Sequence, residues 1–290
     1  MASKDVVAGL GEIGLPIQKV LSRGRTVLGY DADPARSEGK RLKAHKDDRT
    51  GFLHVCIPFT VNFEDDVISL AEMFRPEAVA VHSTISPYTT ERLQKGLGVP
   101  VIYSATRGVH RRMAGDLKRY TKFYAVYPWA PRAAWAGRAF ASLMRASGVK
   151  TKKMSTPLVL ELAKIVVDTS YYGWLISYAQ ISNAIAAEHG INYDEMWSFS
   201  DEIHKALGNR PKMYPGVIGG HCVIPNLELV QNESLDMIRS LNDAYSSRPP
   251  GRRRPAGGSA RRKPAGGTPR RACTRGSPRR IPRTRRRQNS

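Results

Sequence analysis

The stretch PGVIGGHCVIPN (215–226) places Cys222 directly behind two glycines and a histidine. Glycines allow tight or left-handed backbone, so a substrate could approach the chain closely at this loop. A thiol in such a loop is a candidate nucleophile. A cysteine can equally be a small hydrophobic residue in a structural turn, and these twelve residues alone leave both interpretations open.

A second chemical pair is Lys164 and Asp168, which lie four residues apart and therefore on one face of a helix. Their neighbours Ile165, Val166 and Val167 indicate a largely buried helix. A lysine there is costly unless it is paired or functional. The pair is thus either an ordinary ion pair or part of a site.

A third group, Gly9-x-Gly11-x-x-Gly14, follows an apolar run and opens a helical pattern. In this spacing the first glycine allows the turn, the second lets the backbone approach a pyrophosphate, and the third permits close packing of helix on strand. Asp31 lies 22 residues after Gly9, at the end of the next strand pattern. A carboxylate there can accept hydrogen bonds from ribose hydroxyls and repels a 2′-phosphate, so the sequence predicts an NAD site rather than an NADP site.

The elements that carry the glycine motif alternate between strand and helix, which predicts an α/β Rossmann domain over residues 1–154 with a parallel sheet covered on both faces. Thr89 is the expected N-cap of one helix. The strand patterns are 5–9, 26–33, 52–58, 77–86, 99–106 and 122–128, and the helical patterns are 15–24, 65–74, 89–97 and 132–148.

Residues 155–245 predict an all-helical domain. One helix is expected over 157–188, about 48 Å long, followed by helices over 192–207 and 227–245, with the cysteine loop between the last two. Tyr171, Tyr172, Trp174 and Tyr178 lie along the long helix. We expect this apolar helix to pair with its counterpart in a homodimer, the alternative being a core helix of a monomer.

The charge is concentrated at one end of the chain. The net charge is +21, but residues 246–290 hold fifteen arginines, one lysine and no acid, which leaves about +5 for the remainder. This Arg/Pro/Gly-rich tail is expected to be disordered. It would either bind nucleic acid through phosphates or represent a stretch read out of frame.

Three widely spaced cysteines suit a reducing compartment. There is no apolar leader and no continuous apolar stretch of about 20 residues. We therefore expect a cytoplasmic protein without a membrane span or a metal site.

Taken together, the motifs resemble the UDP-glucose/GDP-mannose dehydrogenase family over about residues 3–242. The matching stretches are VAGLGEIGLP, GYDADP, VCIPF, HSTISPYTTE, ELAKIVVD and PGVIGGHCVIPN, in the family's order. The resemblance implies oxidation of a nucleotide sugar's C6 alcohol to a carboxylate with two NAD. It makes Cys222 the nucleophile through a thiohemiacetal and a thioester, with Lys164 stabilising the oxyanion and favouring the thiolate, and places Thr84 beside the nicotinamide.

The sequence also departs from the family. Asp168 stands where the family has asparagine, Asn226 stands where it has aspartate, and Thr106 stands where it has the glutamate that serves hydrolysis. The basic tail stands where a typical member has a nucleotide-holding third domain, so a truncated member is expected. The alternatives are a β-hydroxyacid dehydrogenase, which shares GLGxxGxP and the lysine but needs no cysteine, and an NAD-binding protein without catalysis.

The candidate catalytic residues are Cys222, Lys164, Asp168, Asn226 and Thr84, and the candidate NAD-binding residues are Gly9, Gly11, Glu12, Ile13, Gly14, Asp31, Pro58 and Thr84.

Overall fold

The computed structural model describes residues 3–23, 25–220 and 222–248. These residues form a seven-stranded sheet in the order β2-β1-β3-β4-β5-β6-β7. The chain leaves β1 for β2 on one side and returns to β3 on the other, so the order reverses between β1 and β3. The strands are β1 (Ser3–Ala8), β2 (Thr26–Tyr30), β3 (Arg49–Val55), β4 (Ala78–Val81), β5 (Val101–Tyr103), β6 (Lys122–Val126) and β7 (Thr151–Lys153).

The predicted α/β Rossmann-type fold is confirmed, with one difference in strand direction. β1 to β5 are parallel, but β6 runs antiparallel to β5, with Ile102 opposite Val126. β7 then pairs parallel with β6 as an edge strand that the sequence patterns did not indicate. Its three residues are polar and at least partly exposed, so they carry no apolar signal.

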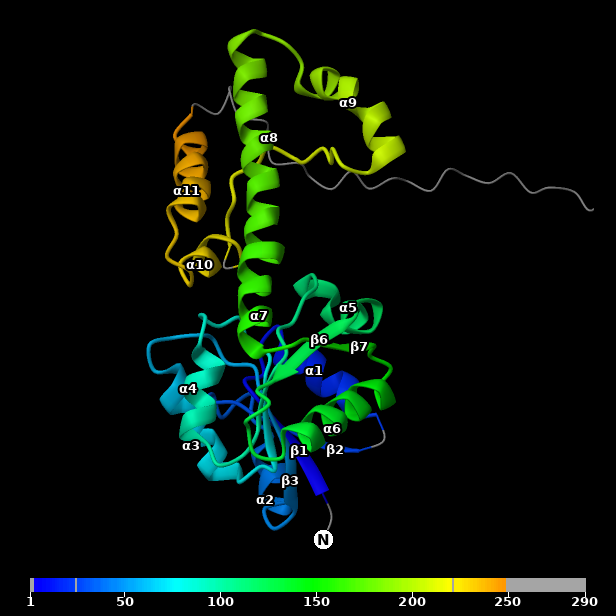
Figure 1. The fold of residues 1–290 in the computed structure, drawn as a ribbon, viewed down its shortest axis with the longest axis vertical. Coiled ribbons are helices and arrows are strands. Elements are labelled where there is room, and N and C mark those ends of the chain that lie inside the picture. The colour runs from blue at the N-terminus through cyan, green and yellow to red at the C-terminus, as the bar shows by residue number, and fades with distance from the viewer. Residues whose placement is uncertain (1–2, 24, 221, 249–290) are drawn as a thin grey trace, which may run out of the picture. The chain divides into compact units, whose positions relative to one another are not determined.

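Helices cover both faces of the sheet (Figure 1). Alternate residues of β1 point to opposite faces: Val7 packs with one core cluster, whereas Val6 and Ala8 pack with the other. The first cluster includes residues of α1 (Gly14–Leu21), α5 (Met113–Arg119) and α6 (Ala133–Ala146). The second includes residues of α3 (Phe63–Phe74) and α4 (Thr89–Gly96). The short α2 (Gly39–Ala44) and the 3₁₀ turn η1 (His110–Arg112) complete this part of the chain.

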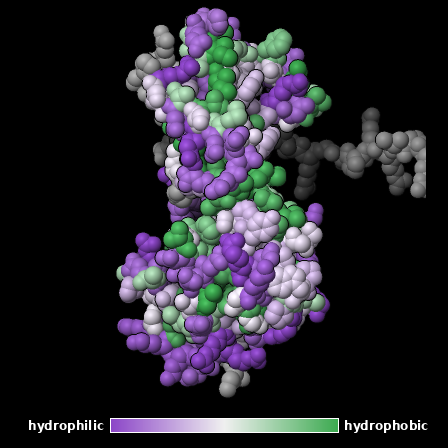
Figure 2. Space-filling model, turned by 60° about the vertical axis from the view of Figure 1, so that its left-hand side comes forward, coloured by the Kyte–Doolittle hydropathy of each residue, from purple (hydrophilic) through white to green (hydrophobic). Residues whose placement is uncertain are grey.

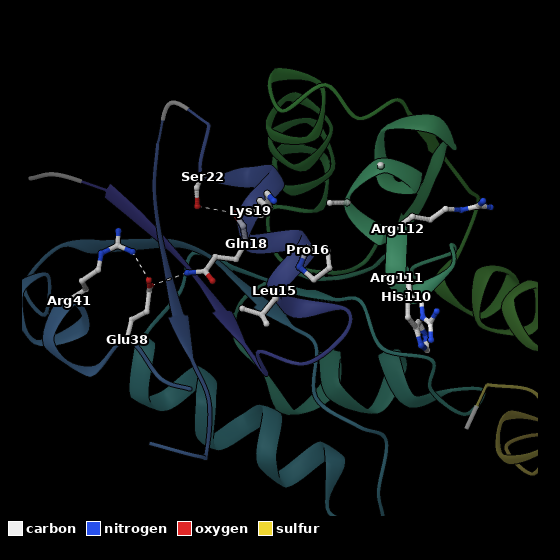
Figure 3. A pocket seen from close by; sticks show the side chains of 12 residues that line it. Leu15, Pro16, Gln18, Lys19, Ser22, Glu38, Arg41, His110, Arg111 and Arg112 are labelled. Carbon is white, nitrogen blue, oxygen red and sulfur yellow. Dashed lines mark hydrogen bonds and ion pairs between the residues drawn. The ribbon is translucent and has the colours of Figure 1, made fainter. Parts of the chain in front are cut away.

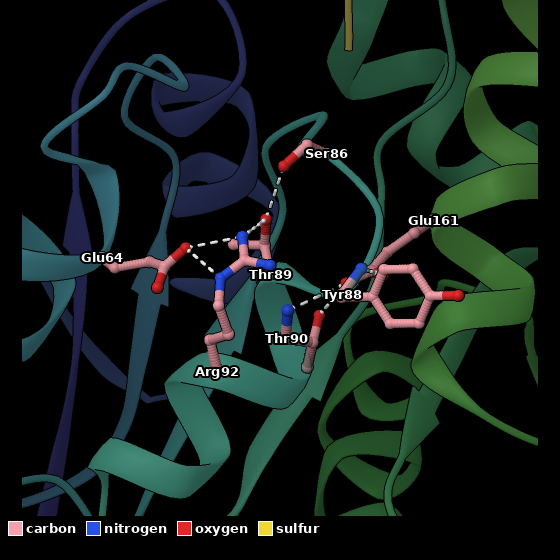
Figure 4. A network of polar contacts seen from close by, with 7 residues as sticks. All are labelled: Glu64, Ser86, Tyr88, Thr89, Thr90, Arg92 and Glu161. Atoms are coloured by element: carbon pink, nitrogen blue, oxygen red, sulfur yellow. Dashed lines mark hydrogen bonds and ion pairs between the residues drawn. The ribbon is translucent and has the colours of Figure 1, made fainter. Parts of the chain in front are cut away.

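The start of α4 differs from the prediction that Thr89 is its N-cap. The N-cap is Tyr88, in a left-handed conformation with φ of 68°. The N–H groups of Tyr88 and Thr90 donate to the carboxylate of Glu161, at 2.8 and 2.9 Å (Figure 4). This buried side chain from α7 (Pro157–Leu162) therefore satisfies the helix terminus, and the Thr89 hydroxyl is left to bond Ser86.

The long helix predicted over 157–188 is helical throughout but is not a single α-helix. α7 leads into a π-helical segment, η2 (Ala163–Ser170), and then into α8 (Tyr171–Glu188). The expected burial around Lys164 is also only partly right: Ile165 is buried, whereas Val166 and Val167 are 41% and 69% exposed. Figure 2 shows hydrophobic surface in the upper half of the molecule, where α8 lies.

Three further helices follow α8. The predicted helix over 192–207 is found as α9 (Tyr193–Leu207). The helix expected over 227–245 is instead a short α10 (Ile224–Leu227) and a separate α11 (Glu233–Ser246). The break arises because the Asn232 side chain accepts from the N–H of Ser234 and starts α11 anew.

No helix among the described residues is both long and apolar enough to cross a membrane. The predicted basic tail lies outside the described residues from residue 249 onward.

Candidate functional site

The carboxyl ends of the parallel strands meet at one edge of the sheet, and most of the predicted site residues lie there. The glycine motif follows β1, Asp31 follows β2, Pro58 lies three residues after β3 and Thr84 three residues after β4. Ligands of open α/β sheets bind at this edge, at the point where the strand order reverses. Here that point lies between β1 and β3.

The three glycines have different surroundings, which fit the roles predicted for them. Gly9 has φ of +88°, and a Cβ on it would lie 2.8 Å from the carbonyl oxygen of Cys56. A Cβ on Gly14 would lie 1.7 Å from the carbonyl oxygen of Gly9. A Cβ on Gly11 would meet no protein atom within 4 Å, so this backbone faces open space.

The residues between the glycines leave the start of α1 available to an anion. Ile13 is the N-cap of α1, and its apolar side chain cannot accept hydrogen bonds from the first N–H groups of the helix. The Leu15 N–H already donates to the Gly11 carbonyl at 3.2 Å and Pro16 has no N–H, so it is the positive end of the helix dipole that would attract a phosphate here. The open backbone at Gly11 together with this terminus fits the pyrophosphate of a dinucleotide.

Asp31 is tied to the glycine loop. Its Oδ2 accepts from the N–H of Leu10 at 2.7 Å, and its Oδ1 accepts from the N–H of Asp33 at 2.9 Å. Each carboxylate oxygen has a second lone pair, so the group can also accept hydrogen bonds from a ribose. The contact fixes Asp31 beside the loop, as an NAD site requires.

The cysteine loop is held by α11 on one side and by α10 on the other. The Asn242 side chain accepts from the N–H of Ile218 at 2.7 Å and donates to its carbonyl at 3.2 Å. The Asn226 side chain donates to the carbonyl oxygen of Cys222 at 2.6 Å. Cys222 itself is exposed. Asn226 therefore positions the backbone of the candidate nucleophile.

Cys222 also contacts His110 of the Rossmann part, and His110 in turn contacts Glu12. Its Sγ lies 3.5 Å from Nε2 of His110 in η1. Nδ1 of His110 lies 2.7 Å from Oε2 of Glu12, which belongs to the glycine loop. The structure thus brings the cysteine loop to the predicted cofactor loop through a histidine that the sequence patterns did not single out.

Lys164 and Asp168 form the predicted ion pair, with Nζ and Oδ2 2.7 Å apart. The Lys164 side chain is 13% exposed, and η2, which carries it, packs against α10. Although Cys222 is exposed as a residue, partial desolvation of its sulfur raises the pKa of the thiol. The Glu12 carboxylate raises this pKa further, whereas Lys164 lowers it. Lys164 therefore acts in the direction that the sequence predicts, but the net shift of this pKa is upward.

The position of the missing glutamate is part of a buried polar cluster. Thr106, after β5, accepts a hydrogen bond at 3.1 Å from Nζ of the buried Lys122, which also donates to the carbonyl oxygen of Ser104 at 2.9 Å. Burial lowers the pKa of Lys122 to about 7 and raises that of Cys56 to about 12. Cys56 directly follows β3 and is partly buried.

An open pocket of about 660 Å³ adjoins the same region (Figure 3). It lies beside α1 and is lined on its far side by η1 and the start of α5. Four cationic side chains, those of Lys19, Arg41, Arg111 and Arg112, make the pocket basic, and Glu38 is the acid among the residues that line it. His110 lines the pocket as well.

Two residues of this candidate site, His110 and Lys122, are not indicated by the sequence. His110 stands in GVHRR, where neither spacing nor periodicity marks it. Lys122 begins a strand pattern and reads as an exposed strand end, although it is buried.

No protein-family model and no curated protein matches this chain. Among solved structures, it is similar to UDP-D-ManNAc dehydrogenase from Pyrococcus horikoshii (20% identity, TM-score 0.65) and to UDP-N-acetyl-mannosamine dehydrogenase from Staphylococcus aureus (19%, 0.63). Each match covers 83% of this chain and 68% of the other. It is also similar to 3-hydroxyisobutyrate dehydrogenase from Mycobacterium tuberculosis (17%, 0.59), with 85% of this chain and 92% of that chain covered. The chain therefore has the fold of the nucleotide-sugar dehydrogenases, which is the fold that the sequence resemblance predicts.

Proposed function

We propose that this chain is an NAD-dependent oxidoreductase of the nucleotide-sugar dehydrogenase family, which oxidises a CH–OH group of a nucleotide sugar. The observation that carries the proposal is the meeting of two loops. The glycine loop 9–14, built to receive a dinucleotide, and the loop that presents the Cys222 thiol are joined through Glu12 and His110. A hydride acceptor and a nucleophile would therefore face one substrate.

The cofactor would be held by the backbone of the glycine loop, the N-terminus of α1 and the carboxylate of Asp31. Glu12, Ile13 and Gly14 line the turn, and Pro58 and Thr84 lie at the ends of the neighbouring strands. When bound, NAD supplies the hydride acceptor. Asp31 favours NAD over NADP because its negative charge opposes a 2′-phosphate.

The chemistry of the substrate would be carried by the residues around Cys222. Attack of the Cys222 sulfur on an aldehyde gives a thiohemiacetal, and the Lys164 ammonium would stabilise the developing oxyanion. The Asp168 carboxylate pairs with the Lys164 ammonium at 2.7 Å. Asn226 fixes the backbone of the nucleophile.

Hydrolysis of the thioester is the step for which this chain lacks the family's catalytic residue, a glutamate. Thr106 stands at the position of the family's glutamate, and its neighbour Lys122 already uses its amine in hydrogen bonds to backbone and hydroxyl oxygens. A burst of NADH followed by slow turnover is the expected kinetic pattern.

A second candidate is a β-hydroxyacid dehydrogenase. The match to the mycobacterial 3-hydroxyisobutyrate dehydrogenase covers 92% of that chain, more than the 68% covered for the two sugar dehydrogenases. Such an enzyme would use the glycine loop and Lys164 but would have no need for Cys222.

A homodimer through residues 157–188 is also proposed. Large apolar side chains of this helical segment are exposed in the single chain, as a face that packs against another copy would be. They are Val159, Leu162, Val166, Val167, Tyr171, Tyr172, Tyr178 and Ile185.

The test is NADH formation by the full chain with NAD and a panel of UDP-N-acetylmannosamine, UDP-glucose, GDP-mannose and 3-hydroxyisobutyrate. Under the first proposal a nucleotide sugar yields NADH and Cys222→Ser removes the second oxidation, so that the aldehyde accumulates. Under the second proposal only the hydroxyacid reacts, Cys222→Ser is as active as wild type, and Lys164→Ala is inactive. No NADH with any of the four, in a chain that binds NAD, would overturn both.

A further inference from the structure

Three side chains that are far apart in the sequence form one line of contacts. Cys222 lies in the loop before α10, His110 in η1 and Glu12 in the glycine loop. The distances along this line are 3.5 Å from Sγ to Nε2 and 2.7 Å from Nδ1 to Oε2. Both ring nitrogens of one histidine are therefore engaged, one with a potential nucleophile and the other with a carboxylate.

The carboxylate decides which ring nitrogen carries the proton. An ionised carboxylate can only accept hydrogen bonds, so Nδ1 of His110 must donate to Glu12. In the neutral imidazole Nε2 is then the unprotonated nitrogen, which can accept a hydrogen bond, and it is this atom that faces the sulfur. The Cys222 S–H can donate to it.

The electrostatic surroundings of Cys222 call for such a base. Burial and Glu12 raise the pKa of the thiol, and Lys164 opposes them without reversing the shift. Within the described residues 3–23, 25–220 and 222–248, Glu12 and Lys164 act electrostatically on the sulfur, and His110 contacts it. A thiol that stays protonated near neutral pH becomes a nucleophile only when a neighbouring group takes its proton.

We propose that Cys222, His110 and Glu12 form a catalytic triad in which His110 is the general base for the thiol and Glu12 is the positioning residue that sets its tautomer. In the reaction the sulfur forms a bond to the carbonyl carbon of an aldehyde. The electron pair of the C=O π bond moves to oxygen, and the thiol proton moves to Nε2 of His110. Only the choice of an aldehyde as electrophile rests on the proposed function; the proton transfer does not.

The geometry also assigns a second role to the glycine loop. Glu12 lies one residue after Gly11, at the point where the backbone is open to a pyrophosphate. The same turn that would receive the dinucleotide therefore orients the base of the nucleophile. A shift of this loop on binding would change the distance between Nε2 and the sulfur.

The experiment measures alkylation of Cys222 by iodoacetamide in the full chain, without NAD or sugar, by mass-spectrometric peptide mapping over a pH series. His110→Gln is expected to slow labelling of Cys222 about a hundredfold near pH 7, the lower end of the range for a general base, and to move the midpoint of the pH–rate curve upward. Free imidazole added to His110→Gly should restore part of the rate. Arg111→Gln, the neighbour in η1, is the matched control and should label as wild type does.

Glu12→Gln distinguishes a positioning role of Glu12 from a purely electrostatic one, because the two roles predict opposite changes in the labelling rate of Cys222. Removing the charge alone would lower the pKa of the thiol and speed labelling. Loss of the positioned base would slow labelling by about tenfold, and this is the expected result.

Labelling of Cys222 at the wild-type rate in both histidine variants, or faster labelling in Glu12→Gln, would overturn the triad. Circular dichroism checks the fold of each variant; if the histidine variants fail to fold, the sign of the Glu12→Gln effect decides alone. Failure of the dehydrogenase proposal is distinguishable: no NADH would form with any sugar, while the labelling pattern would still follow His110 and Glu12.

Discussion

Gly11 and Gly14 belong to one motif, yet a methyl group added to each is expected to have opposite consequences. In Gly14→Ala the new Cβ would lie 1.7 Å from the carbonyl oxygen of Gly9 and 3.3 Å from Cβ of Cys56. The nearer of these two atoms, the Gly9 carbonyl oxygen, belongs to the backbone and cannot move aside as a side chain could. In Gly11→Ala the new Cβ would meet nothing within 4 Å.

The sizes of the two effects follow from these contacts. Alanine is favoured over glycine inside a helix by about 1 kcal/mol, but overpacking of a filled site costs about 1–3 kcal/mol or more. Because the clash at Gly14 is with backbone, we expect a net loss of about 2 kcal/mol in the free energy of unfolding. At roughly 2–4 °C for each kcal/mol, the melting temperature should fall by about 4–8 °C. Gly11→Ala should stay within about 0.5 kcal/mol of wild type.

The affinity for NAD should be reduced in Gly11→Ala, the variant whose stability is expected to be nearly unchanged. The added methyl of Gly11→Ala occupies the space through which the pyrophosphate approaches the backbone, so the affinity should fall at least about tenfold, or about 1.4 kcal/mol. Urea denaturation gives the stabilities, and calorimetric titration of NAD gives the affinities. Wild-type affinity in Gly11→Ala, or equal destabilisation of the two variants, would refute the assignment of the glycine roles.

Three further predictions concern the cofactor, a buried amine and the assembly. NAD should bind more tightly than NADP in parallel titrations. Asp31→Asn, which keeps a hydrogen-bond acceptor for Leu10, should reduce the difference between the two affinities. Equal affinities for NAD and NADP in the wild type would contradict this prediction. Lys122 has a folded-state pKa of about 7 against 10.5 unfolded, so between these values the unfolded chain binds the extra proton and stability rises with pH. In urea denaturation, the free energy of unfolding of the wild type should therefore increase relative to that of Lys122→Met between about pH 7 and about pH 9. A difference between the two proteins that stays constant with pH would refute the lowered pKa of Lys122. Sedimentation at micromolar concentration should give a dimer for the wild type and a monomer for Val167→Glu; a monomeric wild type would exclude pairing through this helix.

Short-range features of the site could be predicted from the sequence. The glycine spacing, Asp31 and the Lys164–Asp168 pair each depend on residues within one strand–turn–helix unit or one helical turn, and their local pattern is sufficient. The parallel strands β1 to β5 were also predictable, because buried strands carry continuous apolar runs.

The remainder depends on contacts that no local pattern encodes. His110 lies 112 residues from Cys222 and meets it only once the two loops have been folded together. The direction of β6 likewise cannot be predicted from the sequence, since a buried strand has the same composition whether it runs parallel or antiparallel to its neighbour. The burial of Lys122 follows from that direction, because reversal of β6 brings its first residue to the ends of the parallel strands.

The π-helical segment η2 determines the angle by which α8 is rotated about the helix axis relative to α7. Before it, Glu161 fixes α7 to the N-terminus of α4. After it, Gly173 lets Val223 and Ile238 approach α8, with distances of 3.1 and 3.2 Å to a Cβ placed there. Each residue advances an α-helix by about 100°, so loss of one residue such as Val167 would turn α8 by about that angle relative to α7. Every side chain around Cys222 and every side chain around His110 would survive such a deletion, yet the two sets would no longer face each other, and the contact between Cys222 and His110 would be lost through this rotation alone.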